Sequence, residues 1–257
     1  MAHDLAGLSA AFSHAMQKLR AEHFAGSVEA DREESHARLA AAPFRGELVA
    51  ARVDTLETIE QRRAFWMNIY NACVSLSIVE LGLRGSILLR AEFYIRTAIE
   101  IGGLGFSLDA IENGVLRANR RPRAWPLRPF GRSDPRLAHC LPQPEPRLCF
   151  ALNKGVASSP SLRVFEPRTI GRELEAAEAE FSAVHFIADS GERRICCSRL
   201  YGWARRDMDG RWLDDPAYRG WKVSYEPFDW RVSSGQGPER RASVDRRGGK
   251  ANEHTAR

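Results

Sequence analysis

Residues 56–81 constrain the fold more than any other part of the chain. They form a long, mainly apolar run with helical periodicity, and Gly82 follows as a stop signal. A polar stripe crosses this run at intervals of seven, three and four residues, which place its members on one helical face. These members are Gln61, Asn68, Asn71 and Ser75. The pattern predicts a long central helix with one polar face.

Asn amides inside such an apolar helix need hydrogen-bond partners. Two interpretations are open for Asn68 and Asn71. They bond to the backbone of a neighbouring loop and hold the fold, or they line a binding site. Asp229, which precedes Trp230, is expected to hydrogen-bond to the face that carries both amides.

Apolar periodicity and capping residues predict the other elements. Further helices are expected over residues 4–24, 26–42, 108–118, 172–185 and 199–203, with a break at 43–46. Ser107 and Ser198 are expected to cap the helices that follow them. Short strands are expected over residues 99–101, 148–153, 195–197 and 222–225.

These elements predict a single α+β domain that is rich in helix. One small β-sheet should form from the segments near 99, 150, 196 and 224, with helix 56–81 passing through the centre. Residues 1–49 are expected to be a helical segment packed on the main domain, 50–232. Residues 233–257 are rich in Gly, Ser and Arg without periodicity, which predicts a disordered basic tail.

The formal net charge is +5, and it is unevenly distributed. Residues 117–136 carry seven Arg and one Asp, and residues 231–257 carry seven basic and three acidic side chains. The rest of the chain is therefore mildly acidic. The Arg117–Arg136 loop could attract an anionic polymer, or its arginines could simply keep an irregular loop hydrated.

Several classes of protein are excluded or disfavoured. Five Cys residues are too few for a disulfide scaffold, and neither a membrane span nor a secretory leader is expected. The expected location is therefore the cytoplasm, with reduced thiols. The seven His residues show no ligand spacing, so neither a metal site nor a cofactor is expected. Gly102, Gly103 and Gly105 lack the rest of a dinucleotide fingerprint, so a tight strand-to-helix turn explains them.

Four sequence blocks, in order, resemble one family. The chain reads AFWMNIYNA at 64–72, IGGLGFSLDAIENGVLR at 101–117, FALNKGVASSPSLRVFEP at 150–167 and KVSYEPFDWRVS at 222–233, with DPR at 134–136. Together they resemble the domain of unknown function 547 family over about residues 50–232. Plant relatives carry a leucine-zipper label, and some animal relatives are joined to glutaredoxin domains. The resemblance itself implies no established activity.

The chain departs from the family pattern where relatives usually carry His or Cys. Asn113 and Cys149 stand at the two His positions, and Lys154 and Ser159 stand at the two Cys positions. The segment 204–221 is also shorter than in relatives. These changes favour a binding or scaffold domain that retains a degenerate pocket, with no cofactor. Its expected pocket residues are Asn68, Tyr70, Asn71, Glu112, Asn113, Ser159, Arg163 and Asp229.

Two other functions stay open. The first is a cysteine-dependent hydrolase or transferase that acts on a small thiol or peptide, with Cys149 and Lys154 as candidate catalytic residues. A Ser–Lys dyad of Lys154 with Ser158 or Ser159 is a further form of this chemistry. The second is binding of a polyanion by the Arg-rich loop. The partner is otherwise unknown, and a small molecule or a peptide is the expected ligand.

Overall fold

The chain folds around α3, Ile59–Glu80, whose residues from Ala64 to Val79 are all buried. The computed structural model describes residues 4–26, 32–87, 92–121 and 127–235. α3 starts with a capping box: Gln61 N donates to Thr58 Oγ1 at 3.1 Å, and Thr58 N donates to Gln61 Oε1 at 3.0 Å. The central position expected for this helix is confirmed.

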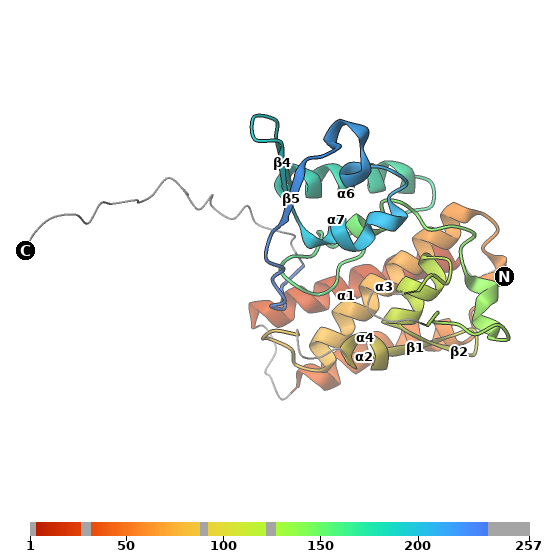
Figure 1. Cartoon of the computed structure of the whole chain (residues 1–257). Coiled ribbons are helices and arrows are strands. Elements are labelled where there is room, and N and C mark those ends of the chain that lie inside the picture. The colour runs from red at the N-terminus through yellow and green to blue at the C-terminus, as the bar shows by residue number, and fades with distance from the viewer. Residues whose placement is uncertain (1–3, 27–31, 88–91, 122–126, 236–257) are drawn as a thin grey trace, which may run out of the picture.

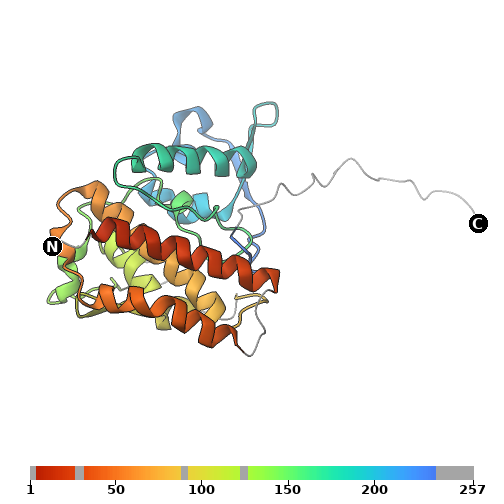
Figure 2. The same ribbon diagram turned by 180° about the vertical axis from the view of Figure 1, so that it is seen from behind.

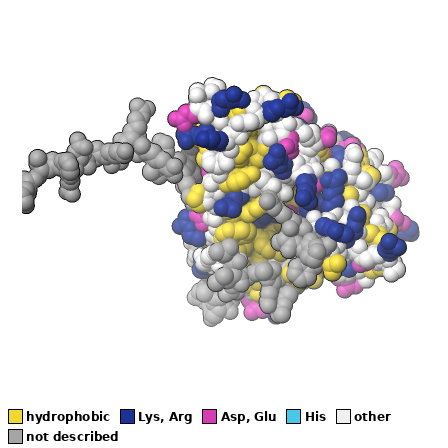
Figure 3. All heavy atoms as spheres, viewed as in Figure 1, with side chains coloured by type: hydrophobic (Ala, Val, Ile, Leu, Met, Phe, Trp, Pro, Cys, Tyr) yellow, Lys and Arg dark blue, Asp and Glu magenta, His cyan; other side chains and the backbone are white. Residues whose placement is uncertain are grey.

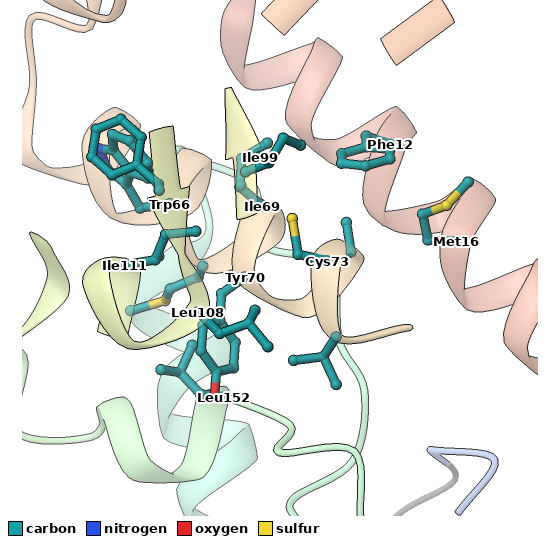
Figure 4. Close-up of a cluster of buried hydrophobic side chains, with 14 of the residues drawn as sticks. Phe12, Met16, Trp66, Ile69, Tyr70, Cys73, Ile99, Leu108, Ile111 and Leu152 are labelled. Atoms are coloured by element: carbon teal, nitrogen blue, oxygen red, sulfur yellow. The ribbon is translucent and has the colours of Figure 1, made fainter. Parts of the chain in front are cut away.

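Helices pack on α3 and enclose the larger apolar core. α1, Leu5–Ala25, lies along α3, and α2, Glu33–Val49, lies beside both helices (Figure 2). Phe12 and Met16 of α1 meet Ile69 and Cys73 of α3 in this core (Figure 4). None of the helices in the described ranges is long and apolar enough to cross a membrane.

α2 runs through the break that was expected at 43–46. Pro43 lies inside the helix and removes one backbone donor. The carbonyl that loses this partner belongs to Leu39, whose side chain is 75% exposed, so water reaches this side of the helix. Burial of Ala37, Ala41 and Leu48 on the opposite face keeps the helix intact.

The strands form two sheets, where one was expected (Figure 1). β1, Ala98–Ile101, and β2, Leu104–Ser107, form an antiparallel hairpin beside α4, Glu92–Arg96. Gly102 and Gly103 have φ of 58° and 77° and make its turn, so this is a strand-to-strand connection rather than the strand-to-helix turn predicted.

The second sheet lies next to α6, Ile170–His185, and α7, Arg199–Ala204, and together they form one half of the molecule (Figure 1). The other half consists of α1 to α4 and the β1–β2 hairpin. β3, Phe186–Asp189, is antiparallel to β4, Arg194–Cys197, and β4 is parallel to β5, Lys222–Tyr225. Ser198 caps α7 as predicted, since its side chain accepts from Leu200 N at 3.3 Å. The Cys196 and Cys197 thiols are free.

The strand expected over 148–153 is wrong: this segment is the short helix α5, Leu148–Ala151. Alternation of Leu148, Phe150 and Leu152 suggested a strand. Instead, Leu148 and Leu152 enter the core around α3, whereas Phe150 enters a second core beside α6 and α7. The segment joins two cores, and it pairs with none of the strands in the described ranges.

The helix expected over 108–118 is present but is mostly a π-helix, Ala110–Leu116. Ser107 Oγ accepts from Ala110 N at 3.1 Å, as a cap should, and Arg117 N bonds to Glu112 O five residues earlier. Gly114 is required here, because a Cβ at this position would lie 2.4 Å from the Phe130 ring. π-helical turns are rare and occur frequently at functional sites.

The closing segment 229–233 connects the two halves through main-chain hydrogen bonds. Ile87 N donates to Trp230 O at 3.0 Å, and Ala157 N donates to Arg231 O at 2.8 Å. Arg20 of α1 is fully buried and binds Ser233 O through Nε at 2.8 Å. Of the tail expected over 233–257, residues 236–257 lie outside the described part of the chain.

Candidate functional site

A cavity of about 630 Å³ lies between the two halves of the molecule. The π-helix, α5 with its flanking residues, and α7 with the turn after it supply most of its wall, and Tyr94 and Trp230 complete it. The wall is formed by Tyr94, Asp109, Glu112, Asn113, Arg117, Glu145, Pro146, Leu148, Cys149, Leu152, Lys154, Leu200, Trp203, Ala204, Asp207 and Trp230. Figure 3 shows apolar side chains gathered near the middle of one face, with Lys and Arg around them.

Glu112 and Lys154 form an ion pair in the cavity wall. Lys154 Nζ lies 2.7 and 2.8 Å from the two Glu112 carboxylate oxygens, and Tyr70 Oη donates to Glu112 Oε2 at 3.0 Å. Burial alone would raise the pKa of Glu112, but the Lys154 charge and these hydrogen bonds outweigh it and hold the pKa below its ordinary value. Glu112 is therefore ionised and matched by Lys154 at neutral pH.

Asn113 links two acidic residues of the wall. Its Nδ2 donates to Asp109 Oδ1 at 2.8 Å, and its Oδ1 accepts from Arg117. Arg117 Nε in turn donates to Asp207 Oδ2 at 2.6 Å, and Arg120 donates to the other oxygen of Asp207 at 2.7 Å. The wide turn of the π-helix thus presents Asp109, Asn113 and Arg117 along one edge of the cavity.

Cys149 contributes a neutral thiol to the wall. Burial raises the pKa of this thiol far above its ordinary value, and the negative charge of Glu178 raises it further. Lys154 acts in the opposite direction but does not outweigh these effects. A thiolate, the nucleophilic form of cysteine, is therefore disfavoured here.

The structure brings four of the predicted residues together on the cavity wall: Glu112, Asn113, Cys149 and Lys154. Tyr70 reaches this group through Glu112, and Ser159 lies behind it, accepting from Lys154 N at 3.1 Å. Of the four positions that the resemblance predicts to depart from the family pattern, three therefore share one cavity, and the fourth, Ser159, supports the backbone of Lys154.

Asn68 and Asn71 lie away from the cavity wall, and their side chains form hydrogen bonds with main-chain groups instead. Asn68 Nδ2 donates to Phe165 O at 2.9 Å, and its Oδ1 accepts from Phe165 N at the same distance. Asn71 Nδ2 donates to Ala151 O at 3.2 Å, and its Oδ1 accepts from Asn153 N at 3.0 Å. Of the two interpretations, the geometry supports bonding to neighbouring backbone.

Arg163 and Asp229 also lie outside the wall. The Arg163 side chain pairs with Glu180. The predicted bond from Asp229 to the two Asn amides is wrong, because Asn68 Nδ2 and Asn71 Nδ2 donate to Phe165 O and Ala151 O. The Asp229 carboxylate accepts from Arg231 Nη2 at 2.6 Å. Asp229 N donates to Ser158 Oγ at 2.8 Å.

The Ser–Lys dyad is not formed. The Ser158 hydroxyl binds Asp229 N, the Ser159 hydroxyl binds Lys154 N, and Lys154 Nζ binds Glu112. Each candidate group already has a partner of its own, and none of these partners is the other member of a dyad.

Sequence reasoning missed part of the wall. Asp109 was detectable, since it precedes Asn113 by four residues and so shares its helical face. Trp203 and Trp230 were not detectable, because they come from separate elements. Their rings lie 5.9 Å apart, and the Phe228 ring packs at a tilt against both, at 4.8 Å from Trp203 and 4.7 Å from Trp230.

The Arg-rich loop binds mainly to the protein itself. Arg117 and Arg120 share Asp207, Arg128 donates to Asn119 O at 3.1 Å, and Arg136 pairs with Asp134 at 2.7 Å. Residues 122–126 of the loop lie outside the described ranges.

Comparison with known proteins identifies one similarity. A family model described as "Protein of unknown function, DUF547" matches residues 53–181. The match includes α3, the π-helix and α5, and it ends before α7 and the expected closing motif at 222–233. No curated protein and no solved structure matches the chain. The cavity thus combines a wall inside the matched range with a second wall, including Trp203 and Trp230, outside it.

Proposed function

Because the chain belongs to the DUF547 family, which is described as a family of unknown function, we propose its function from its own cavity: it binds a small molecule there without covalent chemistry. One observation carries the proposal. Glu112 is ion-paired with Lys154, Asp207 is ion-paired with Arg117, and the Cys149 thiol is neutral, so none of these three described residues is an activated nucleophile.

The rest of the wall suits an apolar ligand body. Leu148, Leu152, Leu200, Trp203 and Trp230 offer apolar and aromatic surface. A largely apolar cavity of about 630 Å³ with a few convergent polar groups has the size and character of small-molecule sites. Three of the four positions that we expect to differ from the family pattern, Asn113, Cys149 and Lys154, lie in this same wall, which supports a pocket converted from another role to binding.

The absence of covalent chemistry is tested by alkylation of Cys149. We measure its rate with iodoacetamide from pH 5 to 9 and use Cys149→Ser to subtract the other thiols. Slow alkylation that accelerates only above the ordinary thiol pKa, about 8.5, is expected. An apparent pKa well below that value contradicts the proposal and supports the cysteine-dependent enzyme.

Binding is tested with a neutral amphipathic probe, 3-phenylpropan-1-ol, by ligand-observed NMR. Ala204 lines the cavity, so Ala204→Trp should fill it and abolish binding. Ala179 lies exposed on α6, so Ala179→Trp is the matched control and should bind like the wild type. Equal binding by both variants would place the probe elsewhere and reject this cavity as the site.

We also propose a reducing location such as the cytoplasm, which the five free thiols support. Binding of a polyanion has less support, because Arg117, Arg120, Arg128 and Arg136 already contact acidic side chains or main-chain carbonyls. If a polyanion does bind, its affinity should fall steeply with salt.

A further inference from the structure

Resting on the proposed function, we infer that the ligand of this cavity is an organic cation, a protonated amine on an apolar body. Asp109 would bind the ammonium group, and Trp203 and Trp230 would cover the body. The proposal rests on which charges of the wall are already matched and on where the aromatic surface lies.

Asp109 differs from the other acidic residues of the cavity. Glu112 pairs with Lys154, Asp207 pairs with Arg117 and Arg120, and Glu145 pairs with Arg63 and Arg147. Within the described ranges, the Asp109 carboxylate has a hydrogen bond from the neutral Asn113 amide and no ion pair. It is the acidic group of this wall that is left for a cation of the ligand.

The surroundings of Asp109 make such a cation favourable. Burial raises its pKa, which means that the ionised carboxylate has lost favourable hydration. Lys154 and Arg117 act on it from nearby, but their charges are matched by Glu112 and Asp207. Arg120, the second partner of Asp207, is 47% exposed, so water screens it. Among the described residues of the wall, Asp109 is therefore the carboxylate without an ion-pair partner of its own.

The aromatic wall fits the same ligand. Trp203 and Trp230 line the cavity and are held by Phe228, which packs on both rings. Indole faces attract cations electrostatically and also bury flat apolar groups. A carboxylate combined with indole rings is a recognition set for an alkyl or aryl ammonium ion. A carboxylic acid, in contrast, would meet an unmatched charge of its own sign.

The test compares three probes of one shape and different charge: 3-phenylpropylammonium, 3-phenylpropan-1-ol and 3-phenylpropanoate. Wild-type protein should bind the ammonium about tenfold more tightly than the alcohol, as expected for a hydrogen bond to a charged rather than a neutral group. It should bind the carboxylate most weakly. Affinities are measured by ligand-observed NMR titration at constant ionic strength.

Asp109→Asn should remove the preference for the ammonium while leaving the affinity for the alcohol within about twofold. The Asn side chain can still accept the hydrogen bond from Asn113, so the local fold is retained. Asp209 is exposed and lies outside the cavity wall, so Asp209→Asn is the matched control and should keep the preference.

The outcomes separate the two proposals. If wild-type protein binds none of the three probes, the proposed binding function is rejected, and this inference with it. If it binds the alcohol as tightly as the ammonium, or binds the carboxylate best, the binding function stands and the inference is overturned. This ranking needs no variant, so it decides the matter even if Asp109→Asn fails to fold.

Discussion

Replacing Asn71 by Ala tests how α3 holds the segment that carries Cys149 and Lys154. The change removes the acceptor of Asn153 N at 3.0 Å and the donor to Ala151 O at 3.2 Å. Both backbone groups belong to buried residues, so water cannot replace the amide. Leaving one buried polar group unpaired costs about 1–3 kcal/mol.

Asn71 Nδ2 also lies 3.4 Å from Arg163 O, a longer contact. Loss of the two shorter bonds should lower the free energy of unfolding by about 2–6 kcal/mol, a large part of the 5–15 kcal/mol that is typical of folded domains. The assay is urea unfolding at pH 7, followed by circular dichroism. The midpoint should fall at nearly constant slope, since the surface exposed on unfolding changes little.

Ser75→Ala is the matched control on the same helix and the same polar stripe. Ser75 is fully buried, and in the described part of the chain its Oγ has no hydrogen-bond partner. Removing this hydroxyl should leave stability within about 1 kcal/mol of wild type or increase it. If Asn71→Ala lowers the free energy of unfolding by less than about 1 kcal/mol, or if both variants lower it equally, the proposed role of the Asn71 amide in holding this backbone is refuted.

Three further predictions concern the cavity and its support. Glu112→Gln should reduce the loss of stability that the wild type shows at acidic pH. The lowered pKa of Glu112 means that its ionised form stabilises the fold above about pH 4.3 and that this stabilisation is lost as the pH falls. Thermal melts over a pH series in which the variant loses as much stability as the wild type would contradict the prediction. Asp109→Asn should stabilise the protein at pH 7 but not at pH 3, because a raised pKa means that ionisation of Asp109 opposes folding; equal melting shifts at both pH values would contradict it. Gly114→Ala should destabilise by about 1–3 kcal/mol, because its Cβ would collide with the Phe130 ring; a neutral effect in urea would show that Phe130 moves without cost.

The predictions about Asp109 connect stability with function. A partly buried carboxylate without an ion-pair partner costs the fold some stability, and such costs are typical of binding sites. The same variant is therefore expected to gain stability and to lose preference for a cationic probe. A structural role for Asp109 would instead predict that both properties fall together.

The cavity is formed partly by residues inside the range of the family match and partly by residues outside it. The matched range contains Asn113 of the π-helix, Cys149 of α5 and Lys154, which follows α5. The ligand's apolar surroundings come partly from Trp203 and Trp230, beyond the match. We expect ligand preference to depend on both parts.

The sequence by itself determined the elements whose signals are local. The periodicity of residues 56–81 identified α3, and the caps at Ser107 and Ser198 were correctly placed, because a helix and its first turn depend on residues within a few positions of one another. The sequence also predicted that Asn68 and Asn71 need hydrogen-bond partners, because an amide buried in an apolar helix cannot bond to water.

Tertiary structure alone decided how these elements meet. Alternation of apolar side chains over 148–153 predicted a strand, but the segment contains a short helix. Asn71 hydrogen-bonds to the backbone on either side of Leu152, and the alternating side chains are buried in two separate cores. Trp203 and Trp230 converge only through packing of α7 against the closing segment. The matched and unmatched charges of the cavity likewise depend on side chains far apart in the chain, and no local pattern encodes such pairs.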